Sequence, residues 1–102
     1  MDVTISKNGV PTRLTEERWL HIVENHDDVA GYYDEVLNTI EEPDYVIKGY
    51  RGAFIALRKV TERKFLAVVY RETSEEDAFI ITAYFTSKLK LEEETITWEK
   101  QL

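Results

Sequence analysis

The sequence predicts an α+β fold in which two N-terminal helices pack on a roughly four-stranded antiparallel meander sheet. Up to Pro43, apolar residues recur at helical spacing, whereas after Pro43 they alternate with polar residues at the period of a strand. Short polar connections separate the later segments, which favours a meander. The chain has 102 residues and contains no repeat or low-complexity tract. We therefore expect a single compact domain over residues 1–102.

The N-terminal segment combines a short strand pattern with a strong helix signal. Residues 3–6 (VTIS) alternate like a strand and are followed by a turn sequence. Thr15 precedes two glutamates, as is typical of a helix N-terminus. Leu14 and Trp19 occupy the positions of a hydrophobic staple around this cap. The sequence therefore predicts a helix over residues 15–26.

A second helix is expected over residues 31–42, ending before Pro43. Beyond it, segments rich in β-branched and aromatic residues predict four strands. They lie within residues 44–50, 52–60, 64–72 and 77–87. Residues 94–100 (ETITWEK) also alternate, which leaves open an extra strand that pairs with the N-terminal one.

The last long strand is expected to present two different faces, because successive side chains of a strand point to opposite sides. One set is expected to pack against the helices and the other to point away from them. The first set is Phe79, Ile81, Ala83 and Phe85, and the second is Ile80, Thr82, Tyr84 and Thr86.

Composition restricts the classes of function. The chain has no cysteine, which excludes disulfides and thiolate metal sites. It lacks a run of 18 apolar residues, and its first ten residues do not resemble a signal peptide, so we expect a cytoplasmic protein without a membrane segment. The net charge of −7 is unfavourable for binding nucleic acid unless the bases cluster on one face.

Both histidines lie in the first predicted helix, within RWLHIVENH. His26 falls on the apolar side, where an imidazole can cap the terminal carbonyls of the helix. His21 shares a border stripe with Arg18 and Asn25, where an ordinary surface role is the simplest interpretation. The two histidines are about 140° apart around the helix, which is unsuitable for sharing an ion. We therefore expect no metal and no cofactor.

Four stretches together resemble a known family: RLTEERWLHIVENH, EEPDYVIKG, FLAVVYRE and FIITAYFTS. The resemblance covers about residues 12–87 and is to the phage-associated branch of the barnase–EndoU–colicin–RelE-like nucleases. It implies two N-terminal helices followed by a four-stranded sheet, and metal-independent RNA cleavage as a toxin or phage-encoded effector. The positions that match are Arg18, His21, His26, Thr82 and Tyr84.

Cleavage of RNA through its 2′-hydroxyl needs a base, an acid and cations around the phosphate. His21 is our candidate for the base or the acid, because histidine titrates near neutral pH. Arg18, together with Arg51 or Arg58, would hold the phosphate. Thr82 and Tyr84 would donate hydrogen bonds or stack a base, and His26 would contribute to substrate binding. The sequence does not identify the second acid–base group.

Two other classes of function remain open. The same fold could serve as a non-catalytic interaction domain that binds a cognate protein partner, such as an antitoxin, or a nucleic acid. Alternatively, the acidic surface could inhibit a basic nuclease. The oligomeric state is also open, because an exposed edge strand invites pairing.

Overall fold

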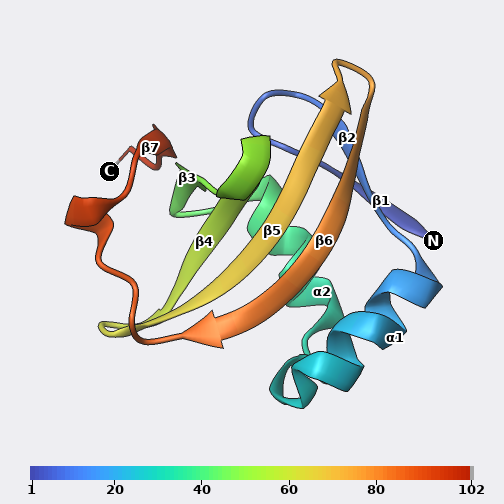
Figure 1. Cartoon of the computed structure of the whole chain (residues 1–102), viewed down its shortest axis with the longest axis horizontal. Helices are drawn as coiled ribbons and strands as arrows, with labels where there is room; N and C mark the ends of the chain where they lie inside the picture. Colours follow the sequence, from blue (N-terminus) through green and yellow to red (C-terminus); the bar gives the residue numbers. More distant parts are fainter. Residues whose placement is uncertain (102) are drawn as a thin grey trace.

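The chain forms one seven-stranded mixed sheet with two α-helices, seen in a computed structural model that describes residues 1–101 (Figure 1). The strands are β1 (Asp2–Ile5), β2 (Pro11–Leu14), β3 (Tyr45–Lys48), β4 (Phe54–Thr61), β5 (Lys64–Ser74), β6 (Asp77–Thr86) and β7 (Ile96–Glu99). The helices are α1 (Glu16–Asn25) and α2 (Tyr33–Glu41), and the 3₁₀ turns are η1 (Asp27–Val29), η2 (Tyr50–Gly52) and η3 (Leu91–Glu93).

The strand order is β1-β2-β6-β5-β4-β3-β7. Strands β3 to β6 form an antiparallel meander, whereas β2 runs parallel to β6. The α+β class and the meander are as expected, but the prediction of a roughly four-stranded sheet is wrong. Three further strands extend the meander, two at the β6 edge and one at the β3 edge.

Strand β2 was not predicted from the sequence because it has no alternating apolar pattern. It begins with Pro11, has Arg13 in its middle, and is four residues long. Its extended conformation is fixed by its neighbours: it pairs along its length with β1 and at two positions with β6. Tertiary pairing thus determines a strand that local propensity does not specify.

Strand β7 is also placed differently from the expectation. The sequence left open a pairing of the C-terminal segment with the N-terminal strand, but the segment pairs with β3, at the opposite edge of the sheet. Because β2 already occupies the β6 edge, β3 offers the free edge of the meander. Trp98 of β7 lies opposite Val46 and packs against the main apolar core.

The first helix follows the sequence rules closely. The Thr15 hydroxyl accepts a hydrogen bond from the Arg18 backbone N–H at 3.1 Å, which caps the helix. Leu14 is fully buried, and Trp19 packs against the core cluster that contains it. The predicted cap and staple therefore both form and set where α1 begins.

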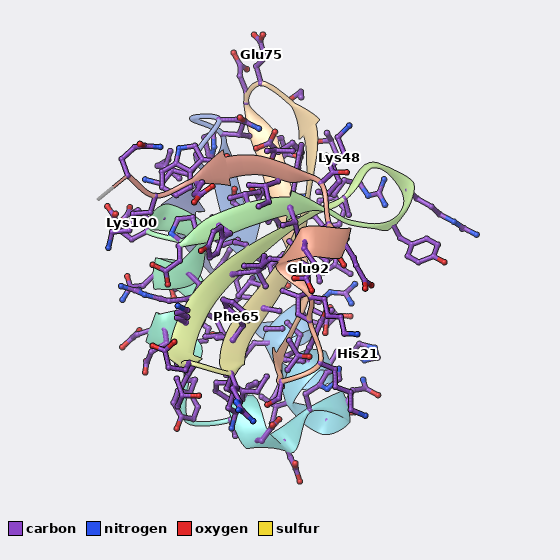
Figure 2. The ribbon with its side chains drawn as sticks, turned by 90° about the vertical axis from the view of Figure 1, so that its left-hand side faces the viewer. His21, Lys48, Phe65, Glu75, Glu92 and Lys100 are labelled. Carbon is purple, nitrogen blue, oxygen red and sulfur yellow. The ribbon has the colours of Figure 1, made fainter. Side chains whose placement is uncertain are left out.

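The sheet has two differently covered faces. On the helix face, α1 and α2 pack over a large core, whereas on the open face only the segment around η3 covers a smaller cluster (Figures 1 and 2). The helix-face core is Leu14, Ile22, Val29, Val36, Ile40, Val46, Ala56, Leu66, Val68, Tyr70, Ile80 and Ala83. The open-face cluster is Ile47, Leu57, Phe65 and Ala67, with Leu89 and Leu91 packed against it.

A β-bulge in β6 changes which side chains reach each face. Tyr70 of β5 lies opposite Ile80, but its neighbour Val69 lies opposite Thr82, so Ile81 is an extra residue. As a result, Ile80 is buried in the helix-face core together with Ala83.

We expected the side chains of this strand to alternate regularly between the two faces. For the residues that precede Ile81, the faces are the reverse of that prediction. Phe79, expected against the helices, lies opposite Arg71 on the open face, and Ile80, expected outside, lies inside. After the bulge, Ala83 and Phe85 pack on the helix-face core as expected, and Tyr84 packs on the open-face cluster.

This exchange of faces can be tested with a pair of substitutions. We predict that Ile80→Ala lowers the free energy of unfolding by about 2–5 kcal/mol, because it leaves a cavity in the helix-face core. Ile81→Ala removes the same atoms from a half-buried bulge position and should cost clearly less. Urea denaturation of both variants measures the difference, and an equal or reversed ranking would contradict the register.

Candidate functional site

The edge of β6 is the structural basis of the candidate site. Strand β2 pairs only with Ala78 and Phe79, so the rest of this edge is free for α1, which lies beside it (Figure 1). An Arg18 Nη1 hydrogen bond to the Ile81 carbonyl, at 3.4 Å, joins the helix to the bulge. Arg18 is thereby held at the free edge of β6.

Arg18 is shared by two adjacent hollows. The larger, of about 630 Å³, follows α1 and is lined by Thr15, Glu17, Arg18, Leu20, His21 and Glu24. The smaller, of about 180 Å³, is also lined by Thr15 and Arg18 and adds Arg13, Phe79 and Ile80. Arg18 thus stands between exposed His21 on the helix and the aromatic ring of Phe79 on the sheet.

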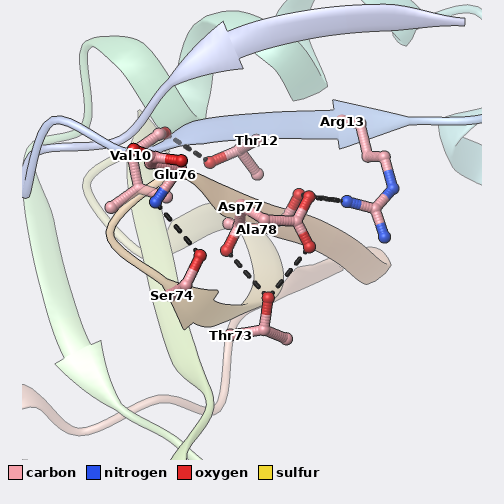
Figure 3. A network of polar contacts seen from close by, with 8 residues as sticks. All are labelled: Val10, Thr12, Arg13, Thr73, Ser74, Glu76, Asp77 and Ala78. Atoms are coloured by element: carbon pink, nitrogen blue, oxygen red, sulfur yellow. Dashed lines mark hydrogen bonds and ion pairs between the residues drawn. The ribbon is translucent and has the colours of Figure 1, made fainter.

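Phe79 lies between two arginines on the open face. Arg13 of β2 is its partner on one side, with the guanidinium carbon 5.5 Å from the ring centroid, and Arg71 of β5 is its partner on the other. Arg13 also forms an ion pair with Asp77, whose carboxylate accepts a 2.9 Å hydrogen bond from the Thr73 hydroxyl (Figure 3). These contacts fix the Arg13 guanidinium beside the ring.

Arg71 continues the basic surface toward η2. Its Nη1 atom donates a 2.6 Å hydrogen bond to the backbone carbonyl of Arg51. Four arginines from four separate elements therefore follow one another, from Arg18 at the edge of β6 to the other three on the open face. We call them the arginine track: Arg18, Arg13, Arg71 and Arg51.

Sequence analysis identified Arg18 and Arg51 but missed Arg13 and Arg71. Both lie in strands whose sequences show no cluster of bases, and only the pairing of β2 and β5 with Phe79 brings them together. The sequence alone does not show which residues face Arg71, because this depends on the register between β5 and β6.

A third hollow, of about 530 Å³, lies on the open face near η2. It is lined by Ile47, Lys48, Gly49, Tyr50, Arg51, Ile55, Tyr84, Leu89 and Glu94. Burial, and to a smaller degree the charge of Glu94, raises the pKa of the Tyr84 phenol. Tyr84 is therefore a neutral hydrogen-bond donor at physiological pH.

His26 is brought to Tyr84 rather than to His21. It ends α1, where its backbone N–H donates to the Ile22 carbonyl at 2.8 Å. Its imidazole packs on the Tyr84 ring, with 5.7 Å between centroids. Thr82 lies on the same face as Tyr84, opposite Val69.

The predicted site residues thus fall into separate groups. Arg18 and His21 share one hollow, and Tyr84 and Arg51 share another. Arg58 alternates with Leu57 and lies opposite Leu66 of the helix-face core, on the other side of the sheet. We expected His21 and Tyr84 to line one hollow, but they line two separate ones.

Comparisons with models of known protein families, with curated proteins and with solved structures find no match to this chain. Within residues 1–101, no three His, Asp or Glu side chains are grouped so that they could hold a metal ion. No helix in the same range has the length and apolarity needed to cross a membrane.

The backbone is strained where the arginine track meets the hollow near η2. Arg51 has φ 53° and ψ 43°, a left-handed conformation that costs a residue with a Cβ roughly 1–2 kcal/mol. Gly52 follows with φ 82° and adopts this region without such a penalty. Strained residues of this kind are concentrated at functional sites.

We predict that Arg51→Gly raises the free energy of unfolding by about 1 kcal/mol, because it relieves this strain. Arg51→Ala keeps the Cβ and should leave stability nearly unchanged, although both variants remove the same guanidinium. Thermal denaturation of the two variants gives the comparison. Equal stability of the glycine and alanine variants would show that the residue is not strained.

Proposed function

We propose that this protein binds RNA on the arginine track and cleaves it without a metal, as a toxin or phage-type effector. One observation carries the proposal: four of the six arginines follow one another from the β6 edge across the open face, in a chain with a net charge of −7. Gathering positive charge in an acidic protein is the arrangement that binding a polyanion requires.

The open face supplies more than charge. Guanidinium groups bind phosphate through two parallel hydrogen bonds, and three of them surround Phe79 and the bulge. The half-buried ring of Phe79 offers a surface on which an unpaired base can stack. Thr82 adds a hydroxyl on the same face. This combination favours single-stranded RNA over a duplex.

The hollow beside Arg18 contains groups that can move protons. Glu17 and Glu24 lie four residues before and three residues after His21, and both line the same hollow. One carboxylate would take the proton of the 2′-hydroxyl, whose oxygen then bonds to phosphorus. His21, in its protonated form, would donate a proton to the departing 5′-oxygen as its bond to phosphorus breaks. Arg18 would stabilise the phosphate charge.

The cellular setting follows from this activity. We place the protein in the cytoplasm, where RNA is available to it. A cognate protein partner or antitoxin would inhibit it by covering the arginine track with acidic residues, since such a partner competes directly with the phosphates.

The second candidate is a non-catalytic domain of the same fold that binds RNA or a protein partner. Two observations favour it: His21 is exposed, and Tyr84 lines the hollow near η2 and not the hollow of His21. A site open on one side excludes water poorly, which weakens its electrostatic interactions.

Incubation with single-stranded RNA in EDTA tests the proposal. We predict that the wild type cleaves RNA and that His21→Ala slows cleavage about 10²-fold, because proton transfer to the leaving oxygen is lost. Arg18→Ala should reduce both binding and cleavage. Arg63→Ala, in the exposed turn between β4 and β5, is the matched control and should behave as wild type.

The outcomes separate the candidates. A folded wild type that binds RNA in a salt-dependent way, and loses binding in Arg18→Ala without ever cleaving, is the interaction domain. Cleavage unaffected by Arg18→Ala and His21→Ala places the activity elsewhere. A folded protein that neither binds nor cleaves RNA contradicts both RNA-based functions.

A further inference from the structure

The hollow near η2 combines features that the arginine track lacks. Its apolar lining comes from Ile47 and Ile55 of the sheet and from Leu89 of the segment after β6, and two cations, Lys48 and Arg51, also line it. Its volume of about 530 Å³ lies within the range of roughly 300–1,000 Å³ typical of small-molecule sites. The chemistry therefore fits a ligand with a flat apolar body and an anionic group.

Polar groups in this hollow suit the edge of a heteroaromatic ring. The neutral phenol of Tyr84 can donate a hydrogen bond, and the carboxylate of Glu94 can accept one. Tyr50 lines the same hollow and is 90% exposed, so its ring is free to contact a ligand face. A nucleobase carries both donors and acceptors on an aromatic ring, and its phosphate supplies the anion.

The hollow is also continuous with the arginine track. Arg51 lines the hollow, and its backbone carbonyl holds Arg71 of the track at 2.6 Å. A strand whose phosphates lie along the track would bring a nucleotide to the hollow at the Arg51 end. The strained backbone at Arg51 stands at this junction.

We propose that the hollow near η2 is a nucleotide subsite, with the base against Ile55 and Tyr84 and the phosphate on Arg51. The inference rests on the proposed function in one respect: the occupant is taken to be a nucleotide of the RNA bound on the track. A free nucleotide has the same chemistry, and the experiment below separates the two sources.

The test follows the isoleucine methyl signals of the protein by NMR during titration with AMP, GMP, CMP or UMP. We expect at least one nucleotide to shift the Ile47 and Ile55 methyl signals saturably. Adenosine and inorganic phosphate, which each supply half of the ligand, should bind at least tenfold more weakly than AMP. No shift with any nucleotide, or an equal affinity for phosphate alone, would overturn the subsite.

Variants locate the binding. Tyr50→Ala changes an almost fully exposed side chain, and Arg51→Gly relieves strain, so neither should unfold the protein. We expect each to weaken nucleotide binding at least fivefold, with Arg63→Ala as the unaffected control. Unchanged affinity in both Tyr50→Ala and Arg51→Gly would place the nucleotide outside this hollow.

The same samples distinguish failure of the subsite from failure of the proposed function. Arg18→Ala should not change mononucleotide binding, because Arg18 lines a different hollow. RNA cleavage in EDTA without methyl shifts from nucleotides would overturn the subsite and leave the proposed function intact. Nucleotide binding in the hollow without RNA binding supports a subsite for free nucleotides and overturns the proposed function.

Discussion

The candidate site depends on one extra residue in one strand. In a regular strand, residues three positions apart face opposite sides, so Phe79 and Thr82 would be separated by the sheet. The bulge at Ile81 places both on the open face. It also leaves the Ile81 carbonyl available to Arg18, so the feature that aligns the open face also attaches α1 to it. A single irregularity thereby joins the helix and the strand.

The net charge of the chain does not reveal that the arginine track forms a positively charged surface. Net charge describes the field far from a protein, whereas a ligand at the surface responds to groups within about 10 Å at moderate salt. Acidic residues dominate the sequence, yet the arginine track has one direct ion pair, between Arg13 and Asp77, within residues 1–101. An acidic chain can therefore still present a cationic face. Because distant acidic groups repel a polyanion, the affinity of that face for RNA would depend on salt.

Sequence reasoning succeeded where local interactions decide the structure and failed where register decides it. The Thr15 cap and the Leu14–Trp19 staple are short-range features, and α1 begins where they predict. Strand β2 and the partner of β7 depend on which edges remain free after the meander forms. Arg13 and Arg71 are 58 residues apart in the sequence. They come together only because each lies opposite Phe79, so no local pattern could have grouped them.

We propose that the open face, aligned by the bulge, is the surface that binds RNA. Backbone amide chemical shifts during titration with a short single-stranded RNA test it residue by residue. The account predicts the largest changes at Arg13, Arg71, Phe79 and Thr82, with little change along α2 on the helix face. Changes concentrated on α2, or none at saturating RNA, would contradict it.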